Sequence, residues 1–145
     1  MSIITLQELE YTDVEWYGID ICGNIAVFCS AGIAKVPDFV CSNKENYETL
    51  IDFFNKLPNH SEVEYLIPPC DVAERFSRKG LYYYDADDNT TSSLMEYYTL
   101  QSKPISPIKI FNLPLKIQNL LKNNLLTVQD FNKQSRIEIE NGYNC

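Results

Sequence analysis

The sequence has few basic residues and a single histidine, and these shortages exclude several functions. Its 145 residues include 12 Lys and Arg against 20 Asp and Glu, a net charge of −8. A general nucleic-acid-binding domain needs a cationic surface, so we expect no nucleic-acid partner. The histidine, His60, lies in a polar segment after Pro58 without a partner motif. We therefore expect no general base or acid of the histidine type.

The chain also lacks long apolar runs and the short motifs of common enzymes. No stretch approaches the ~18 apolar residues of a membrane-spanning helix, and the N-terminal residues have no basic region followed by an apolar core. We therefore expect neither a membrane partner nor a secretory signal. Gly-x-Ser-x-Gly, a Gly-rich phosphate loop and His-Glu-x-x-His are all missing. These absences favour a protein that is not an enzyme and has no cofactor.

The cysteines are odd in number and irregular in spacing, which indicates neither a disulfide framework nor a zinc site. There are five of them: Cys22, Cys29, Cys41, Cys70 and Cys145. Free cysteines pack as small hydrophobic residues, and cytosolic proteins keep them reduced. We therefore expect buried, reduced thiols in a cytoplasmic protein.

Negative charge is concentrated in the first half of the chain. Residues 1–74 carry 13 acids and 3 bases, a net of −10, whereas residues 75–145 carry 7 acids and 9 bases, a net of +2. The simplest interpretation is an acidic surface that maintains solubility. The alternative is an electronegative face that attracts a basic partner and speeds association.

Local signals predict one domain, residues 1–145, of the α+β class. A hairpin is expected from two aromatic and β-branched runs, 16–21 and 25–30, on either side of Gly23 and Asn24. Further strands are expected at 81–84, 96–102 and 136–140, with an extended Pro-containing segment at 103–107. The length suits a single core. We expect a mainly antiparallel sheet with two to three helices packed on one face.

Three segments carry helix signals. Ser42 and Glu45 form a capping box ahead of an apolar stripe that Pro58 ends. The capping pattern recurs at 71–74, before a shorter helix that Gly80 would end at its C′ position. Asn112 would cap a third helix, with Pro114 in its first turn. The apolar positions of the first and third helices are Tyr47, Leu50, Ile51, Phe54, Leu57, Leu113, Ile117, Leu120, Leu121 and Leu125.

The segment from Asp85 to Glu96 has the spacing of an EF-hand calcium loop, with Asp87 and Asn89 at positions 3 and 5. Position 6 is Thr90 where that loop needs glycine, and the flanks read as strands rather than helices. An acidic hairpin loop is the better interpretation. Paired carboxylates for glycoside chemistry could be drawn from the same acids or from residues 62 and 64, but no spacing places two of them in one cleft.

The expected strands on either side of this loop are rich in tyrosine. Alternation sends Tyr83 to one face of the sheet and Tyr82 and Tyr84 to the other, so we expect some of these rings to be accessible. Exposed tyrosine beside aspartate is typical of a protein interface. Cross-strand packing of the rings within the sheet is the alternative.

Two stretches of the sequence carry a family resemblance. The first runs from Asp13 to Pro37 and contains the Trp-bearing hairpin. The second is Gly-Leu-Tyr-Tyr-Tyr-Asp at 80–85, followed by Lys-Pro-Ile-Ser-Pro-Ile at 103–108. These stretches resemble small bacterial immunity proteins of polymorphic and contact-dependent inhibition toxin systems. The resemblance implies a non-enzymatic inhibitor that binds a cognate toxin domain in the cytoplasm. It assigns no functional residue.

An acidic inhibitor can cover the phosphate-binding cleft of a basic nuclease toxin by placing carboxylates where the nucleic acid would lie. We therefore expect contacts with the toxin at the acidic loop and at the segment around residue 63. The alternatives are a calcium- or small-molecule-binding regulatory domain and a carboxylate-based hydrolase. The expected contact residues are Glu62, Glu64, Tyr83, Asp85, Asp87 and Asp88.

Overall fold

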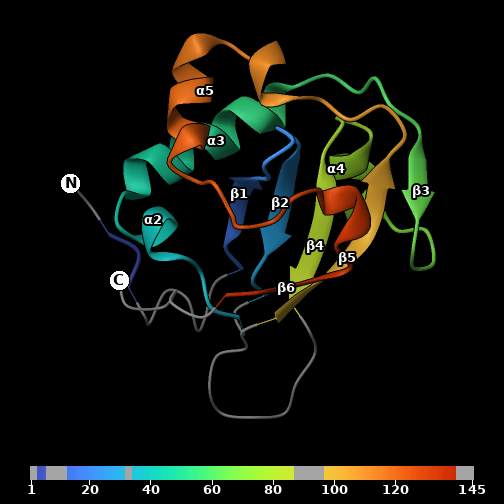
Figure 1. The fold of residues 1–145 in the computed structure, drawn as a ribbon, viewed down its shortest axis with the longest axis horizontal. Coiled ribbons are helices and arrows are strands. Elements are labelled where there is room, and N and C mark those ends of the chain that lie inside the picture. Colours follow the sequence, from blue (N-terminus) through green and yellow to red (C-terminus); the bar gives the residue numbers. More distant parts are fainter. Residues whose placement is uncertain (1–2, 6–12, 32–33, 87–96, 140–145) are drawn as a thin grey trace.

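A computed structural model describes residues 3–5, 13–31, 34–86 and 97–139, and these residues form an α+β fold (Figure 1). The α+β class that the sequence predicts is confirmed. The described part of the sheet has six strands. They are β1 (Glu15–Ile19), β2 (Ile25–Cys29), β3 (Val63–Tyr65), β4 (Tyr82–Ala86), β5 (Tyr97–Pro104) and β6 (Arg136–Glu138).

The strands lie in the order β1-β2-β4-β5-β3, and β6 also pairs with β5. The predicted hairpin is β1–β2, with Gly23 at φ +84° in its turn. The β2–β4 pair is parallel, whereas the other pairs are antiparallel. The mainly antiparallel character of the sheet is therefore confirmed, with one parallel pair near its centre.

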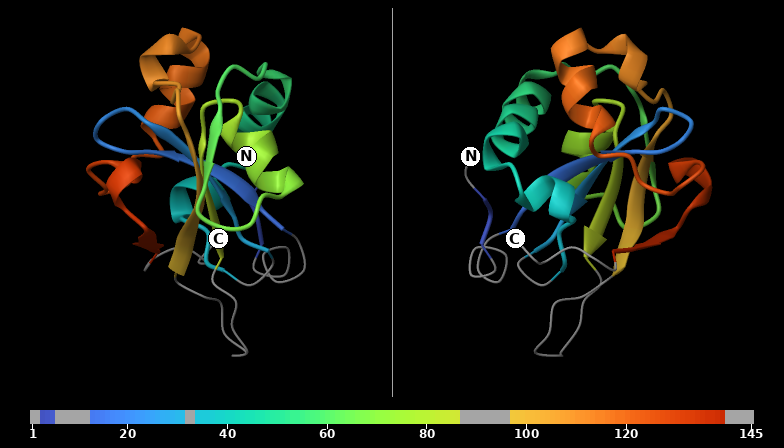
Figure 2. Two further views of the ribbon diagram at one scale, coloured as in Figure 1. Left: turned by 90° about the vertical axis from the view of Figure 1, so that its right-hand side faces the viewer. Right: turned by 60° about the vertical axis from the view of Figure 1, so that its left-hand side comes forward.

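Helices and irregular segments cover both faces of the sheet. The helices are α2 (Asp38–Cys41), α3 (Lys44–Lys56), α4 (Asp71–Ser77) and α5 (Leu115–Lys122), with short 3₁₀ turns η1 (Ile110–Asn112) and η2 (Phe131–Lys133). Apolar residues of α3, α4 and α5 pack on one face, and those of α2 and η2 pack on the other. Figure 2 shows α3 and α4 on one side of the sheet and the η2 segment on the opposite side.

The second covered face buries the tyrosines that the sequence analysis expected to be accessible. Tyr82, Tyr83 and Tyr84 are all at most 5% exposed, so that expectation is wrong for these three rings. On the η2 face, Phe28 stacks between Trp16 and Tyr84, with ring centroids 4.1 and 4.9 Å away. The aromatic rings of these strands therefore pack against one another within the fold.

All three expected helix caps differ from the structure. The N-cap of α4 is Cys70, which makes no side-chain cap bond, and Asp71 is the first residue of the helix. Helix α3 is capped by Asn43, whose side chain accepts the N–H of Asn46, because Ser42 already ends α2. Asn112 does not cap α5. Its side chain accepts the N–H of Lys109 and closes η1, and Pro114 takes the N-cap position of α5.

Gly80 ends α4 as predicted. Its φ is +93°, its N–H donates to the Ser77 carbonyl at 3.0 Å, and the N–H of Leu81 donates to the Phe76 carbonyl at 3.4 Å. These are the two bonds of a Schellman motif, in which the left-handed residue is usually glycine.

A buried carboxylate, Asp20, joins the β1–β2 turn to η2. Its Oδ1 accepts the backbone N–H of Asn24 at 2.8 Å, and its Oδ2 accepts the N–H of Phe131 at 2.7 Å and the side-chain amide of Asn24 at 2.9 Å. Asp20 is 1% exposed. One of the acids counted in the charge of the first half is therefore part of the structure's interior.

The cysteines only partly match expectation. Cys29 is a buried free thiol, whereas the free thiols of Cys22 and Cys70 are exposed. Cys41 is buried and disulfide-bonded, so the expectation of a reduced thiol is wrong at this position. Among the described residues, no helix is both long enough and apolar enough to cross a membrane.

Candidate functional site

Three polar side chains form a row across one end of the sheet. Glu15 on β1 lies opposite Cys29 on β2, and Cys29 lies opposite Asp85 on β4. Directly paired residues share a face, so all three point to the side covered by α3 and α4. Asp13, just before β1, lies at the same end. We call Asp13, Glu15 and Asp85 the acidic end of the sheet.

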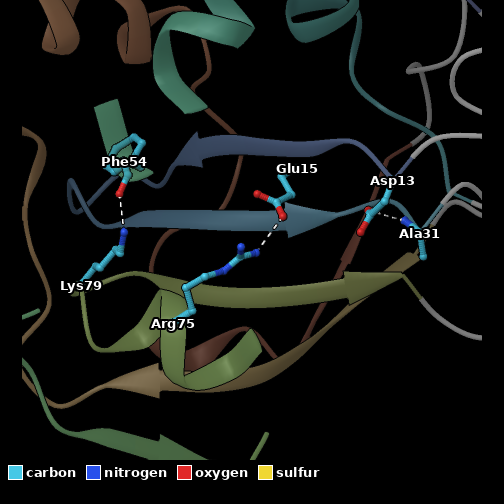
Figure 3. Close-up of polar contacts among 6 residues, drawn as sticks. All are labelled: Asp13, Glu15, Ala31, Phe54, Arg75 and Lys79. Atoms are coloured by element: carbon cyan, nitrogen blue, oxygen red, sulfur yellow. Dashed lines mark hydrogen bonds and ion pairs between the residues drawn. The ribbon is translucent and has the colours of Figure 1, made fainter. Parts of the chain in front are cut away.

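Backbone geometry fixes Asp13 at the open end of the hairpin. Its Oδ1 accepts the N–H of Ala31 at 2.8 Å, and Ala31 has a φ of +53° (Figure 3). The neighbouring residue Val14 is held by Ser30, whose hydroxyl accepts the Val14 N–H at 2.8 Å. Asp13 itself is exposed, so its carboxylate has a fixed position and remains accessible to a partner.

Arginine from the covering helix reaches only one of the three carboxylates. The guanidinium of Arg75 on α4 donates to Glu15 Oε1 at 2.8 Å, with side chains 49% and 23% exposed (Figure 3). In the described part of the chain, Asp13 and Asp85 form no ion pair. The acidic end therefore keeps excess negative charge after the pair with Arg75 is formed.

The groups around Asp85 respond to this charge. Burial raises the pKa of Asp85, which is half-buried, and the Asp13 carboxylate raises it further. The N–H of Ala86, at 3.0 Å, and the Tyr83 hydroxyl lower it by hydrogen bonding. Burial also raises the pKa of the Cys29 thiol, and the carboxylates of all three acidic-end residues add to the rise. This thiol is therefore not an activated nucleophile.

The structure separates the residues that the sequence analysis placed at one interface. Glu64 lies opposite Lys103 on β5, and Lys103 Nζ donates to the Asn132 carbonyl of η2 at 2.8 Å. Glu64 is therefore on the η2 face, whereas Asp85 is on the α3–α4 face. Glu62 precedes β3 and is exposed.

Tyr83 also lies on the α3–α4 face, where its ring packs beside Phe76, and it is 5% exposed. It therefore offers little surface to a partner. Asp87 and Asp88 lie outside the described residues, as do the other expected calcium ligands after Asp85. The flanks of that loop, β4 and β5, are paired strands, as the hairpin interpretation predicts.

Within the described ranges, no three metal-binding side chains of the His, Cys, Asp or Glu type come together. The ring of His60 lies beside neighbouring backbone. Its Nε2 is 3.2 Å from the Ser106 carbonyl, and its Cε1 lies against the backbone of Gly80.

Sequence reasoning missed Asp13, Glu15 and Arg75 as site residues. The first two were counted only as part of the charge of the first half. Their convergence with Asp85 depends on the β1–β2–β4 register, which no local motif encodes.

Comparison with known proteins finds no relative of this chain. No protein-family model, no curated protein and no solved structure matches this chain. The resemblance to immunity proteins therefore stays a prediction.

Proposed function

We propose that this protein binds a basic protein domain through the acidic end of the sheet, and that the partner is a toxin domain which it neutralises by direct contact. The observation that carries the proposal is the convergence of Asp13, Glu15 and Asp85, from three chain segments, around a single arginine contact. The excess negative charge would attract a cationic cleft of the partner. The acidic end would then occupy that cleft in place of nucleic acid. No catalytic group is needed for this function.

The cellular compartment in which the complex forms, the cytoplasm, is part of the proposal. Proteins of the kind that the sequence resembles meet their toxins in the cytoplasm, where thiols are kept reduced. The exposed free thiols of Cys22 and Cys70 suit such a compartment. The disulfide bond at Cys41 is the contrary observation, so the redox state of Cys41 in cells tests this part of the proposal.

The direct test uses the domain encoded next to this gene. We expect the C-terminal domain of the protein encoded immediately upstream to bind this chain in a pull-down and to lose its toxicity when the two are co-expressed. A neighbouring domain that shows no binding would refute the proposal. The calcium-binding alternative makes a different prediction, since Ca²⁺ alone would then raise the melting temperature.

Charge-neutralising variants locate the contact. Asp13→Asn keeps the oxygen that accepts the Ala31 N–H, and Asp85→Asn keeps the size of the side chain. A carboxylate about 8 Å from a partner cation contributes about 0.5 kcal/mol in water. The double variant should therefore associate about fivefold more slowly at low salt, and the difference should shrink at 0.15 M salt, where the Debye length is about 8 Å.

Glu64→Gln is the control because it removes one carboxylate charge on the opposite face, against two in the double variant. Its association rate should stay within about twofold of wild type, since long-range effects of one distant charge are small. Stopped-flow mixing at several salt concentrations measures all three rates. If Glu64→Gln slows association as much as the double variant, only the net charge matters and the acidic end is not the contact.

A further inference from the structure

A cleft beside the edge strand β1 lies next to the acidic end, since Tyr47 in its lining interacts with Glu15. Its volume is about 250 Å³, and it lies between the α2–α3 corner and the end of α5. Apolar side chains such as Trp16, Leu50 and Leu120 line it together with the amides of Asn43 and Asn46. We call it the amide-lined cleft.

The cleft begins where the covering of the β1 edge stops. Beyond α5, the Asn124 carbonyl accepts the N–H of Ile19 at 3.0 Å, and the N–H of Leu126 donates to the Ile19 carbonyl at 2.9 Å. The side-chain amide of Asn124 donates to the Tyr17 carbonyl at 2.7 Å. Alternate residues of a strand repeat their direction, so the N–H of Tyr17 points to this same side. The described residues offer that N–H no acceptor.

Several polar groups of the lining lack a partner in the described part of the chain. The hydroxyl of Tyr17, a residue that lines the cleft, is buried and makes no hydrogen bond there. The side-chain oxygen of Asn43 caps α3, and its NH₂ group does not take part in this bond. The side-chain amides of Asn46 and Asn123 form no hydrogen bond with the described residues. Buried polar groups are normally paired, so the unpaired Tyr17 hydroxyl is unusual, whereas Asn43 and Asn46 are half-buried and Asn123 is exposed.

The lining contains no charged side chain, although the chain as a whole is rich in acids. A charged ligand would lose hydration in this cleft without gaining a counter-ion from the lining residues. A neutral ligand avoids this cost. The size of the cleft sets the second limit. An engineered cavity of about 150 Å³ holds benzene, so about 250 Å³ corresponds to roughly ten non-hydrogen atoms.

We propose that the amide-lined cleft binds a small, uncharged, planar molecule that carries a hydrogen-bond donor beside an acceptor, such as a nucleobase or an aromatic carboxamide. The asparagine amides present the complementary acceptor and donor, and the apolar side chains contact the ring. This proposal goes beyond the binding of a toxin and does not depend on it.

Titration followed by ¹H–¹⁵N NMR tests the ligand class. The probes are cytosine and nicotinamide, with benzoate and benzamidinium as charged compounds of similar size. Ligands of this size reach dissociation constants on the order of 1 mM. We expect saturable shifts of the Asn43 and Asn46 side-chain amides with a neutral probe. No saturable shift with either neutral probe, or equal shifts with the charged compounds, would overturn the proposal.

Two variants on the same helix test the site. Asn46→Leu removes an amide from the cleft, and the loss of its hydrogen bond should weaken binding of the neutral probe about tenfold. Asn55→Leu makes the same change at an exposed position that does not line the cleft. It should leave the dissociation constant unchanged. Equal affinities for the two variants would show that the probe binds elsewhere.

Discussion

Replacement of Asp20 by alanine tests the account of the hairpin turn. The carboxylate accepts the N–H groups of Asn24 and Phe131 and the side-chain amide of Asn24. Those two residues are separated by most of the chain, so this one side chain fixes the turn against η2. Asp20→Ala would leave two buried backbone donors without an acceptor and a space where the carboxylate was.

The magnitude follows from these contacts. Hydrogen bonds to a charged group contribute about 1.5–3 kcal/mol each, and burial of the carboxylate offsets part of that. We therefore expect Asp20→Ala to lower the free energy of unfolding by about 3 kcal/mol. Domains of this size are stable by about 5–15 kcal/mol, so the variant should fold but with a much lower unfolding midpoint.

Urea unfolding followed by circular dichroism measures the loss. Asp38→Ala is the control because Asp38 is exposed in the first turn of α2, and a change of about 0.5 kcal/mol is expected there. In the Asp20 variant, the amides of Asn24 and Phe131 should also exchange hydrogen faster than in wild type. A loss below about 1 kcal/mol would refute the reasoning, because the carboxylate would then not be stabilising the turn.

Two further predictions concern the backbone and the tyrosines. Gly80→Ala should destabilise the fold by about 2–4 kcal/mol, because its φ is +93° and a Cβ would lie 2.7 Å from the Ile108 nitrogen. Gly18→Ala should cost less than half as much in the same urea assay, since its close neighbour is a flexible Leu126 side chain; equal losses would contradict this. Burial raises the pKa of Tyr47 and of Tyr82 to about 12, whereas unfolded tyrosines titrate near 10. The folded state therefore binds these protons more tightly, and stability should be complete below pH 10 and fall as the pH rises from 10 to 12. Phenolate absorbance and circular dichroism recorded together should show ionisation of the buried tyrosines and unfolding in one transition. Ionisation of all ten tyrosines near pH 10 without unfolding would be the contrary result.

Local chemistry made part of the fold predictable. Gly23 and Gly80 both have the positive φ that their positions required, and the apolar stripe of α3 buries Leu50 and Phe54 as expected. The errors arose where neighbours in space decide the outcome. Ser42 is unavailable as a cap because α2 ends there, and nothing local indicated that a second layer would bury Tyr82. That layer comes from segments that are distant in the sequence.

The candidate site was predictable only at Asp85. Net charge showed that the first half of the chain is acidic, but a count of charges does not give positions. The pairing of Glu15 with Cys29 and of Cys29 with Asp85 decides which acids meet. The same register places Glu64 on the other face. A residue's face depends on strand alignment, because a shift of one residue moves every side chain to the opposite face.

The parallel β2–β4 pair also links partner binding to folding. The β1–β2 and β4–β5 pairs are formed by consecutive strands, whereas β2 and β4 are separated by more than fifty residues, and pairings over such separations form slowly. Glu15 belongs to the first pair and Asp85 to the second, so the acidic end forms only when the two halves of the sheet join. A partner that binds there would recognise the joined state alone and stabilise it in proportion to its concentration and affinity.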